Sequence, residues 1–169
     1  MDAPDTVVWS ADRAGWPPES LTAYLAAAPD RAFLETMLDR YETLDYLVDR
    51  AWNPGSSGAV RGLAWRRDRK ADASRARVTE LLRAEFGERY APTVAERYRL
   101  ATLALRDAPA ADYERRLYGL LLDHHRETLA LVERVRPGLE RREVRALAQR
   151  LEDYHRQELA ELARQRGGP

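Results

Sequence analysis

The sequence predicts an all-α protein, a four-helix bundle built from a duplicated helix hairpin with an N-terminal arm and a helical connector. Apolar residues recur at spacings of three and four along four long segments, which is the periodicity of amphipathic helices. The chain also aligns with itself, without a gap, at an offset of 84 residues. No segment has a convincing strand pattern. Four such helices in two antiparallel pairs would bury their apolar stripes against one another.

The internal repeat pairs residues 33–83 with residues 117–167, and 11 of these 51 pairs are identical. The identities include Leu38-Asp39 with Leu122-Asp123, and Val60-Arg61 with Val144-Arg145. They cluster at helix-spaced apolar positions, as expected if two copies of one packing unit keep the same contacts. We therefore expect the two helix pairs to be related by an approximate internal twofold axis.

The length of 169 residues is that of a single domain. We expect an N-terminal arm at 1–29 with a short helix from Glu19 to Ala28, repeats at 30–86 and 112–166, and a helical connector at 87–111. Within the connector, Pro92 is expected to begin a helix that runs to about Leu105. Asp30 and Asp112 are the expected N-caps of the helices that open the two repeats.

Composition excludes several classes of function. The 28 basic residues balance the 28 acidic ones, so no global charge favours nucleic acid or an anionic membrane as partner. No apolar run approaches the roughly 18 residues of a membrane span, and the first residues lack the pattern of an export signal. Cysteine is absent, which excludes thiolate ligands and disulfides. The arginine-rich run 61–83 is expected to be a solvated helix face.

All three histidines belong to the second copy of the repeat. His125 and His155 fall near the centres of the apolar faces of their helices, with Glu158 beside the stripe and His124 nearer an edge. An imidazole or carboxylate in a core costs several kcal/mol unless it is paired, neutralised or bound to a metal. In the first copy the equivalent positions hold Arg40, Tyr41, Ala71 and Ser74.

Two interpretations account for this polar cluster. Imidazole and carboxylate groups from two neighbouring helices suit a transition-metal ion such as Cu, Zn or Ni. The candidate metal ligands are His124, His125, His155 and Glu158. In the alternative, a core ion pair between Arg67 and Glu158, with His155 and Tyr41 completing the hydrogen bonds, explains the same residues without a metal.

Enzymatic chemistry is not expected. A dinuclear iron centre requires Glu-x-x-His on each of two helices, whereas only Glu152-x-x-His155 is present, with Asp68-x-x-Ala71 at its counterpart. Nor does the chain contain a glycine-rich nucleophile elbow or a phosphate-binding loop. No catalytic residues are therefore predicted.

Two stretches of the second repeat resemble the bacterial domain of unknown function 305 family. They are Leu121 to Leu131, which contains His124-His125, and Val144 to Ala148 followed by His155-x-x-Glu158-Leu159-x-x-Leu162. His124, His125 and Glu158 match the pattern of that family, and His155 stands at its usual Gln position. The methionine positions of the family hold leucines in this copy, namely Leu121, Leu131 and Leu162.

The resemblance implies a ferritin-like helical bundle, often present in two copies, and a location outside the cytoplasmic membrane, secreted or periplasmic. It also implies metal homeostasis of a copper type, since some members are associated with copper. The predicted function is a non-enzymatic bundle with a candidate site for one transition-metal ion. The alternative is a structural or protein-interaction module with a buried His/Glu/Arg hydrogen-bond network and no metal.

Overall fold

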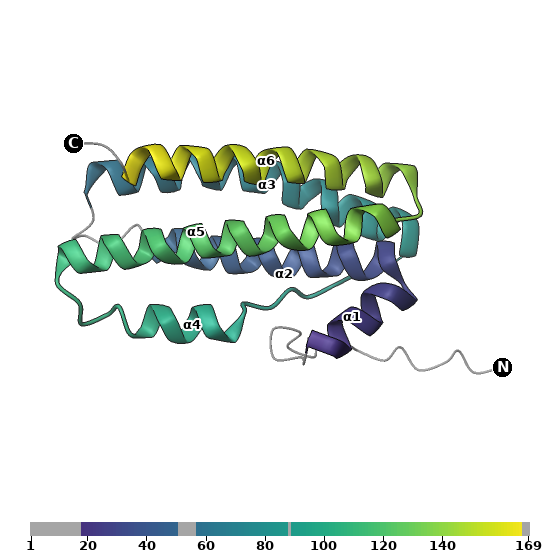
Figure 1. The fold of residues 1–169 in the computed structure, drawn as a ribbon, viewed down its shortest axis with the longest axis horizontal. Coiled ribbons are helices and arrows are strands. Elements are labelled where there is room, and N and C mark those ends of the chain that lie inside the picture. Colours follow the sequence, from purple (N-terminus) through teal and green to yellow (C-terminus); the bar gives the residue numbers. More distant parts are fainter. Residues whose placement is uncertain (1–17, 51–56, 88, 167–169) are drawn as a thin grey trace.

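The computed structural model describes residues 18–50, 57–87 and 89–166, and every regular element within these ranges is a helix (Figure 1). The side chains of residues 18–22, 59, 63–70, 110–111 and 165–166 are not part of the description. The prediction of an all-α protein is therefore confirmed. The predicted N-terminal arm up to residue 17 lies outside the described residues, as do residues 51–56.

The four long segments with helical periodicity are the four long helices of the structure. In chain order the elements are α1 (Pro18–Ala27), α2 (Pro29–Arg50), α3 (Gly58–Phe86), α4 (Glu96–Leu103), α5 (Ala110–Val135), the 3-10 helix η2 (Arg136–Gly138) and α6 (Arg142–Arg166). None of the described helices is both long enough and apolar enough to cross a membrane.

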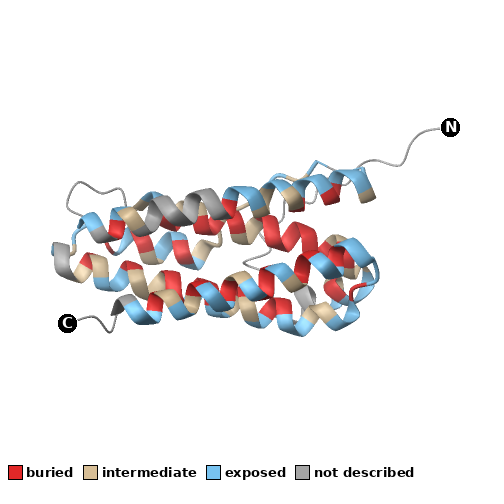
Figure 2. Cartoon of the chain, turned by 90° about the horizontal axis from the view of Figure 1, so that it is seen from above, coloured by how far each residue is buried: buried red, intermediate tan, exposed pale blue. Residues whose placement is uncertain are grey.

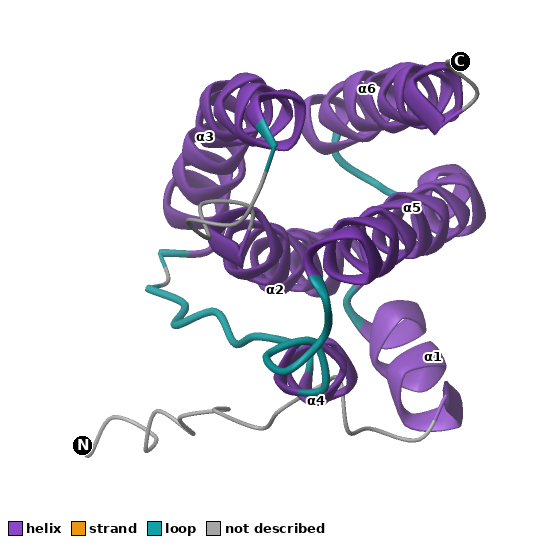
Figure 3. Ribbon diagram, turned by 90° about the vertical axis from the view of Figure 1, so that its left-hand side faces the viewer, coloured by secondary structure: helices purple, strands orange, loops and turns teal. Residues whose placement is uncertain are grey.

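The long helices pack as two pairs, α2 with α3 and α5 with α6, and the pairs meet mainly where α2 lies on α5 (Figure 3). Helix α4 and the segment before it lie outside this arrangement, along α2. Helices α2 and α5 run antiparallel. The start of α2 contacts the turn after α5 through Asp30 and Glu140, and the hydroxyl of Tyr113 near the start of α5 donates to the carbonyl of Arg50.

The core is formed by the apolar stripes of the four long helices, which face one another (Figure 2). Phe33 and Leu44 of α2 are fully buried, as are Leu82 of α3, Leu117 of α5 and Leu151 of α6, with 0 to 1% of their surface exposed. Complete burial of an apolar side chain of this size contributes about 1.5–3 kcal/mol. Hydrophobic packing between the four helices is therefore the main source of stability.

Helix α3 has a hydrogen-bonded cap at each end. Ser57 precedes it, and the Ser57 hydroxyl accepts a hydrogen bond from the amide of Val60 at 3.3 Å. Gly87 ends the helix with φ of 66°, a left-handed conformation that glycine adopts without steric cost, and its amide donates to the carbonyl of Arg83.

Asp30 does not cap α2 as predicted. Helix α2 begins at Pro29, so Asp30 lies in its first turn, and its two carboxylate oxygens accept from the amides of Glu140 and Arg141, both at 2.8 Å. Asp30 thus satisfies amides at the entry to α6. Asp112 likewise lies within the first turn of α5, which follows Pro109. The sequence alone could not show that the turn after α5 lies beside Asp30.

The connector contains less helix than predicted. The sequence predicts a helix from Pro92 to about Leu105, but α4 begins only at Glu96. Upstream of it, the amide of Thr93 donates to Asp39 and the amide of Ala95 donates to the hydroxyl of Thr43, both at 2.9 Å. These amides bond to side chains of α2, which holds the segment against that helix in an extended path.

Replacement of Asp30 by alanine should lower the free energy of unfolding by about 1–2 kcal/mol, because two amides at the entry to α6 lose their acceptor. Urea denaturation followed by circular dichroism measures the change. Asp72→Ala, at an exposed position of α3, is the matched control and should stay within about 0.5 kcal/mol of the wild type. Equal losses in the two variants would contradict this role of Asp30.

Candidate functional site

The three histidines lie in the interior of the protein, at the middle of their helices. His124 and His125 project from α5 and His155 from α6, and each has at most 1% of its surface exposed. The burial of His125 and His155 expected from helical periodicity is confirmed. His124, expected nearer the edge of the stripe, is buried as deeply.

His125 and His155 face each other across the α5–α6 interface. Their Nδ1 atoms are 2.9 Å apart, and the ring centroids are separated by 5.1 Å. A neutral imidazole has one N–H donor and one acceptor nitrogen, so at this contact one ring donates and the other accepts. The ring of Tyr154 packs at 5.0 Å from His155 and 6.1 Å from His125, measured between centroids.

Either ring can be the donor of this hydrogen bond. The ring that carries its proton on Nδ1 donates, and the Nδ1 atom of the other ring accepts. The pair therefore shares one proton between its two facing nitrogens.

His124 connects α5 to α2. Its Nε2 donates to the backbone carbonyl of Arg40 at 2.9 Å, which fixes the proton of this ring on Nε2. The edge of the ring packs on Tyr98 of α4, with 5.6 Å between centroids. His124 is thus held by three helices, and its ring packs edge-on against that of His125 with 5.8 Å between centroids.

Burial keeps His155 and His124 uncharged at neutral pH. It lowers the pKa of His155 to about 3, and the positive charge of Arg40 adds to the effect. Burial also lowers the pKa of His124 well below its ordinary value, with further repulsion from Arg40 and His155. The hydrogen bond to the carbonyl of Arg40 opposes this shift in part.

The two glutamates near the pair are buried but differ in their surroundings. Glu152 forms ion pairs with Arg136 at 2.8 Å and with Arg156 at 2.6 Å, so two cations balance its charge. Glu158 is 5% exposed and follows His155 by three residues on α6. Its predicted partner Arg67 has a side chain outside the described part, so that ion pair stays a prediction. Tyr41 is buried, and burial raises the pKa of its hydroxyl.

The structure brings two of the four predicted metal ligands together, His125 and His155. Within the described part of the chain, no three histidine, aspartate or glutamate side chains are placed so that they could hold one ion. Metal–nitrogen bonds of about 2.0–2.1 Å set two tetrahedral imidazole ligands about 3.3 Å apart, so the pair would open by a few tenths of an ångström. A ligating imidazole also usually donates its second N–H to a partner. The geometry therefore fits a hydrogen-bonded imidazole pair better than it fits a pair of metal ligands.

A group around Glu127 was missed by the sequence reasoning. Its Oε2 is contacted by Arg40 of α2 at 3.3 Å, by Arg97 of α4, and by the hydroxyl of Tyr98 at 3.1 Å. Two of these partners come from the connector. No periodicity or motif indicated that α4 would pack beside the histidines, because its position depends on contacts with α2.

Comparison with known proteins gives no match to a family model, to a curated protein or to a solved structure. The described residues form an all-helical protein with a buried imidazole pair between α5 and α6.

The stability of the protein should fall as the pH is lowered from 7 to 5. Because the pKa of His155 is near 3 in the folded chain and about 6.5 in an unfolded one, only the unfolded state takes up this proton in that range. The free energy of unfolding should drop by about 2 kcal/mol for His155 alone, and His124 should add to the loss.

Urea denaturation at pH 7 and pH 5 measures this dependence. The His155→Leu variant should lack the part of the pH dependence that His155 contributes, whatever its absolute stability. If the leucine variant does not fold, His155→Gln, which keeps a polar side chain, is measured in its place. An unchanged pH dependence in both variants would show that His155 is not a neutral buried group.

Proposed function

We propose that this chain is a non-enzymatic, ferritin-like helical bundle that serves as a structural or protein-interaction module, with histidines that fix how its helices pack. The observation that carries the proposal is the contact between Nδ1 of His125 and Nδ1 of His155 at 2.9 Å, fully buried between α5 and α6. The bond from His124 to the carbonyl of Arg40 adds a second link, between α5 and α2.

Burial and protonation state support a role without catalysis. A general base works best when its pKa lies near the working pH. The pKa of His155 is about 3 and that of His124 is also far below neutrality, and both rings are closed off from solvent. A substrate could reach these nitrogens only if the helices separated.

The order and direction of the helices support the ferritin-like assignment. Helices α2 and α5 are antiparallel neighbours, and one connector leads from the end of α3 to the start of α5, at the other end of the helix pair. A single long crossover of this kind is typical of ferritin-like bundles.

One contact between α5 and α2 supports the internal duplication. His124 and Arg40, which meet between α5 and α2, are 84 residues apart, the offset of the sequence repeat. Equivalent residues touch each other only near a twofold axis. This contact supports two copies related by an approximate twofold axis between α2 and α5.

Binding of one transition-metal ion is a second candidate function. The observation that favours it is the close approach of two uncharged imidazole nitrogens, because neutral imidazole is a good ligand for Cu, Zn and Ni. The resemblance to the domain of unknown function 305 family, in which some members are associated with copper, points the same way. It also suggests a setting outside the cytoplasmic membrane.

A double-mutant cycle tests the structural role of the pair. His125→Leu and His155→Leu should each destabilise the protein, and the double variant should be more stable than the sum of the two losses indicates. The expected coupling is about 1–3 kcal/mol, since each single variant leaves a buried polar partner without its hydrogen bond.

A matched cycle serves as its control. Arg115→Ala changes an exposed residue ten positions before His125 on α5, about 15 Å away along the helix, and should add to His155→Leu within about 0.5 kcal/mol. A coupling of the histidine pair as small as that of this control would refute the structural link.

Metal addition separates the two candidate functions. The structural proposal predicts that Cu, Zn or Ni ions leave the thermal midpoint of the chelator-stripped protein unchanged. A bound ion would raise the midpoint, because it binds only the folded state. The rise would then have to disappear in His155→Ala and persist in Gln157→Ala, an exposed position on the same helix. A rise that survives in His155→Ala would rule out the pair as the metal site.

A further inference from the structure

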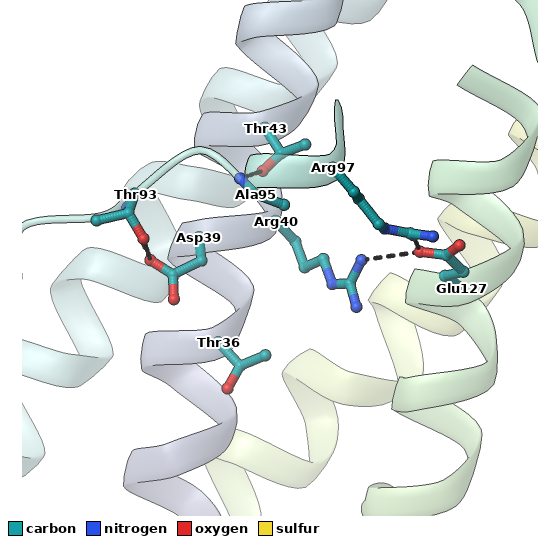
Figure 4. Close-up of a pocket in the computed structure, with 8 residues that line it drawn as sticks. All are labelled: Thr36, Asp39, Arg40, Thr43, Thr93, Ala95, Arg97 and Glu127. Atoms are coloured by element: carbon teal, nitrogen blue, oxygen red, sulfur yellow. Dashed lines mark hydrogen bonds and ion pairs between the residues drawn. The ribbon is translucent and has the colours of Figure 1, made fainter. Parts of the chain in front are cut away.

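A polar pocket of about 310 Å³ lies between α2, α4 and α5, on the side of α2 that carries the connector. Its wall consists of Asp39, Arg40 and Thr43 of α2, the segment before α4, Arg97 of α4 and Glu127 of α5 (Figure 4). It is separate from the facing nitrogens of His125 and His155. Its volume is at the lower end of the range for small-molecule sites.

Of the two cations that line this pocket, Arg40 has fewer hydrogen-bond and ion-pair partners than Arg97 within the described part of the chain. A guanidinium group has five N–H donors. The one hydrogen bond of the Arg40 side chain in the described part of the chain is to Oε2 of Glu127, and it is long at 3.3 Å. Burial lowers the pKa of Arg40, and the charges of Arg97 and Arg134 lower it further, whereas Tyr98 and Asp39 oppose this shift in part. Arg40 therefore holds a positive charge that its surroundings compensate only in part.

The two carboxylates of the pocket are held by other groups. Asp39 accepts from the hydroxyl of Tyr90 and from the amide of Thr93, both at 2.9 Å. Its side chain is turned toward the segment before α4, which contains Thr93 (Figure 4). Glu127 keeps Arg97 and the hydroxyl of Tyr98 as partners if Arg40 moves away. The guanidinium of Arg40 can therefore turn to a ligand without leaving either carboxylate alone.

We propose that this pocket binds a small oxyanion, a carboxylate or a phosphate, with Arg40 as its principal anchor. A guanidinium fork matches the two oxygens of either group in a bidentate contact. Because a water molecule takes about 30 Å³, the pocket has room for a ligand of up to about ten non-hydrogen atoms. Arg97, whose side chain is 57% exposed, stands at the solvent side as a second cation.

Isothermal titration calorimetry on the full chain tests this site. Inorganic phosphate and succinate are titrated separately at constant ionic strength, with chloride as the reference salt. Saturable binding of phosphate alone would identify a phosphate site. Saturable binding of succinate alone would identify a carboxylate site. Either result supports the proposal. The absence of saturable binding for both anions would overturn it.

Arg40→Gln should weaken the binding by about tenfold or more, because a charged hydrogen bond to the ligand is lost. The matched control is Arg75→Gln. Arg75 is also half-buried and pairs with Glu42 and Asp45, but it does not line this pocket, so its replacement should leave the affinity unchanged. Equal affinities of Arg40→Gln and the wild type would overturn the assignment of Arg40.

Two further measurements cover the case in which Arg40→Gln does not fold. Arg97→Gln alters an exposed residue of α4 and should also weaken the binding. In the wild type, the imidazole signals of His124 in nuclear magnetic resonance spectra should shift with the saturation curve of the anion, because its Nε2 bonds to the carbonyl of Arg40. Unchanged affinity in Arg97→Gln together with unmoved His124 signals would refute the site.

Discussion

The packing of this protein depends on the absence of charge on its buried imidazoles. The facing nitrogens of His125 and His155 are 2.9 Å apart, so there is room for one proton between them. A further proton taken up by the pair would go to an outer Nε2 nitrogen and leave this contact intact. It would, however, place a charge in the protein interior, where burial and the positive charge of Arg40 both oppose it. The helix arrangement around the pair is therefore most stable while His155 is neutral.

Outside the apolar core, a second set of interactions holds the connector and the helix ends. Asp39 and Thr43 of α2 accept the amides of the segment before α4, and Asp30 accepts those at the entry to α6. Each of these α2 side chains satisfies backbone groups from a distant part of the chain. Helix α2 thus both contributes to the core and positions the segments that form the polar pocket around Arg40.

Much of this fold could be predicted from the sequence, but the roles of individual polar groups could not. The apolar spacing gave the four long helices, and the same spacing placed His125 and His155 in the interior, as they are. The sequence predicts Asp30 as the cap of its own helix, yet it bonds to amides 110 and 111 residues away. The predicted helix at 92–105 is longer than α4, because local helix propensity carries no information about the hydrogen bond from Thr93 to α2.

The sequence by itself determined the four long helices and which of their faces are buried. Both follow from the helical period of 3.6 residues and from the free energy of removing apolar side chains from water. Only the tertiary structure decided that Nδ1 of His155 meets His125 and that His124 meets a backbone carbonyl of α2. Such contacts depend on how far one helix is shifted along another and on side-chain rotamers. Neither is encoded in the spacing of residues along a single helix.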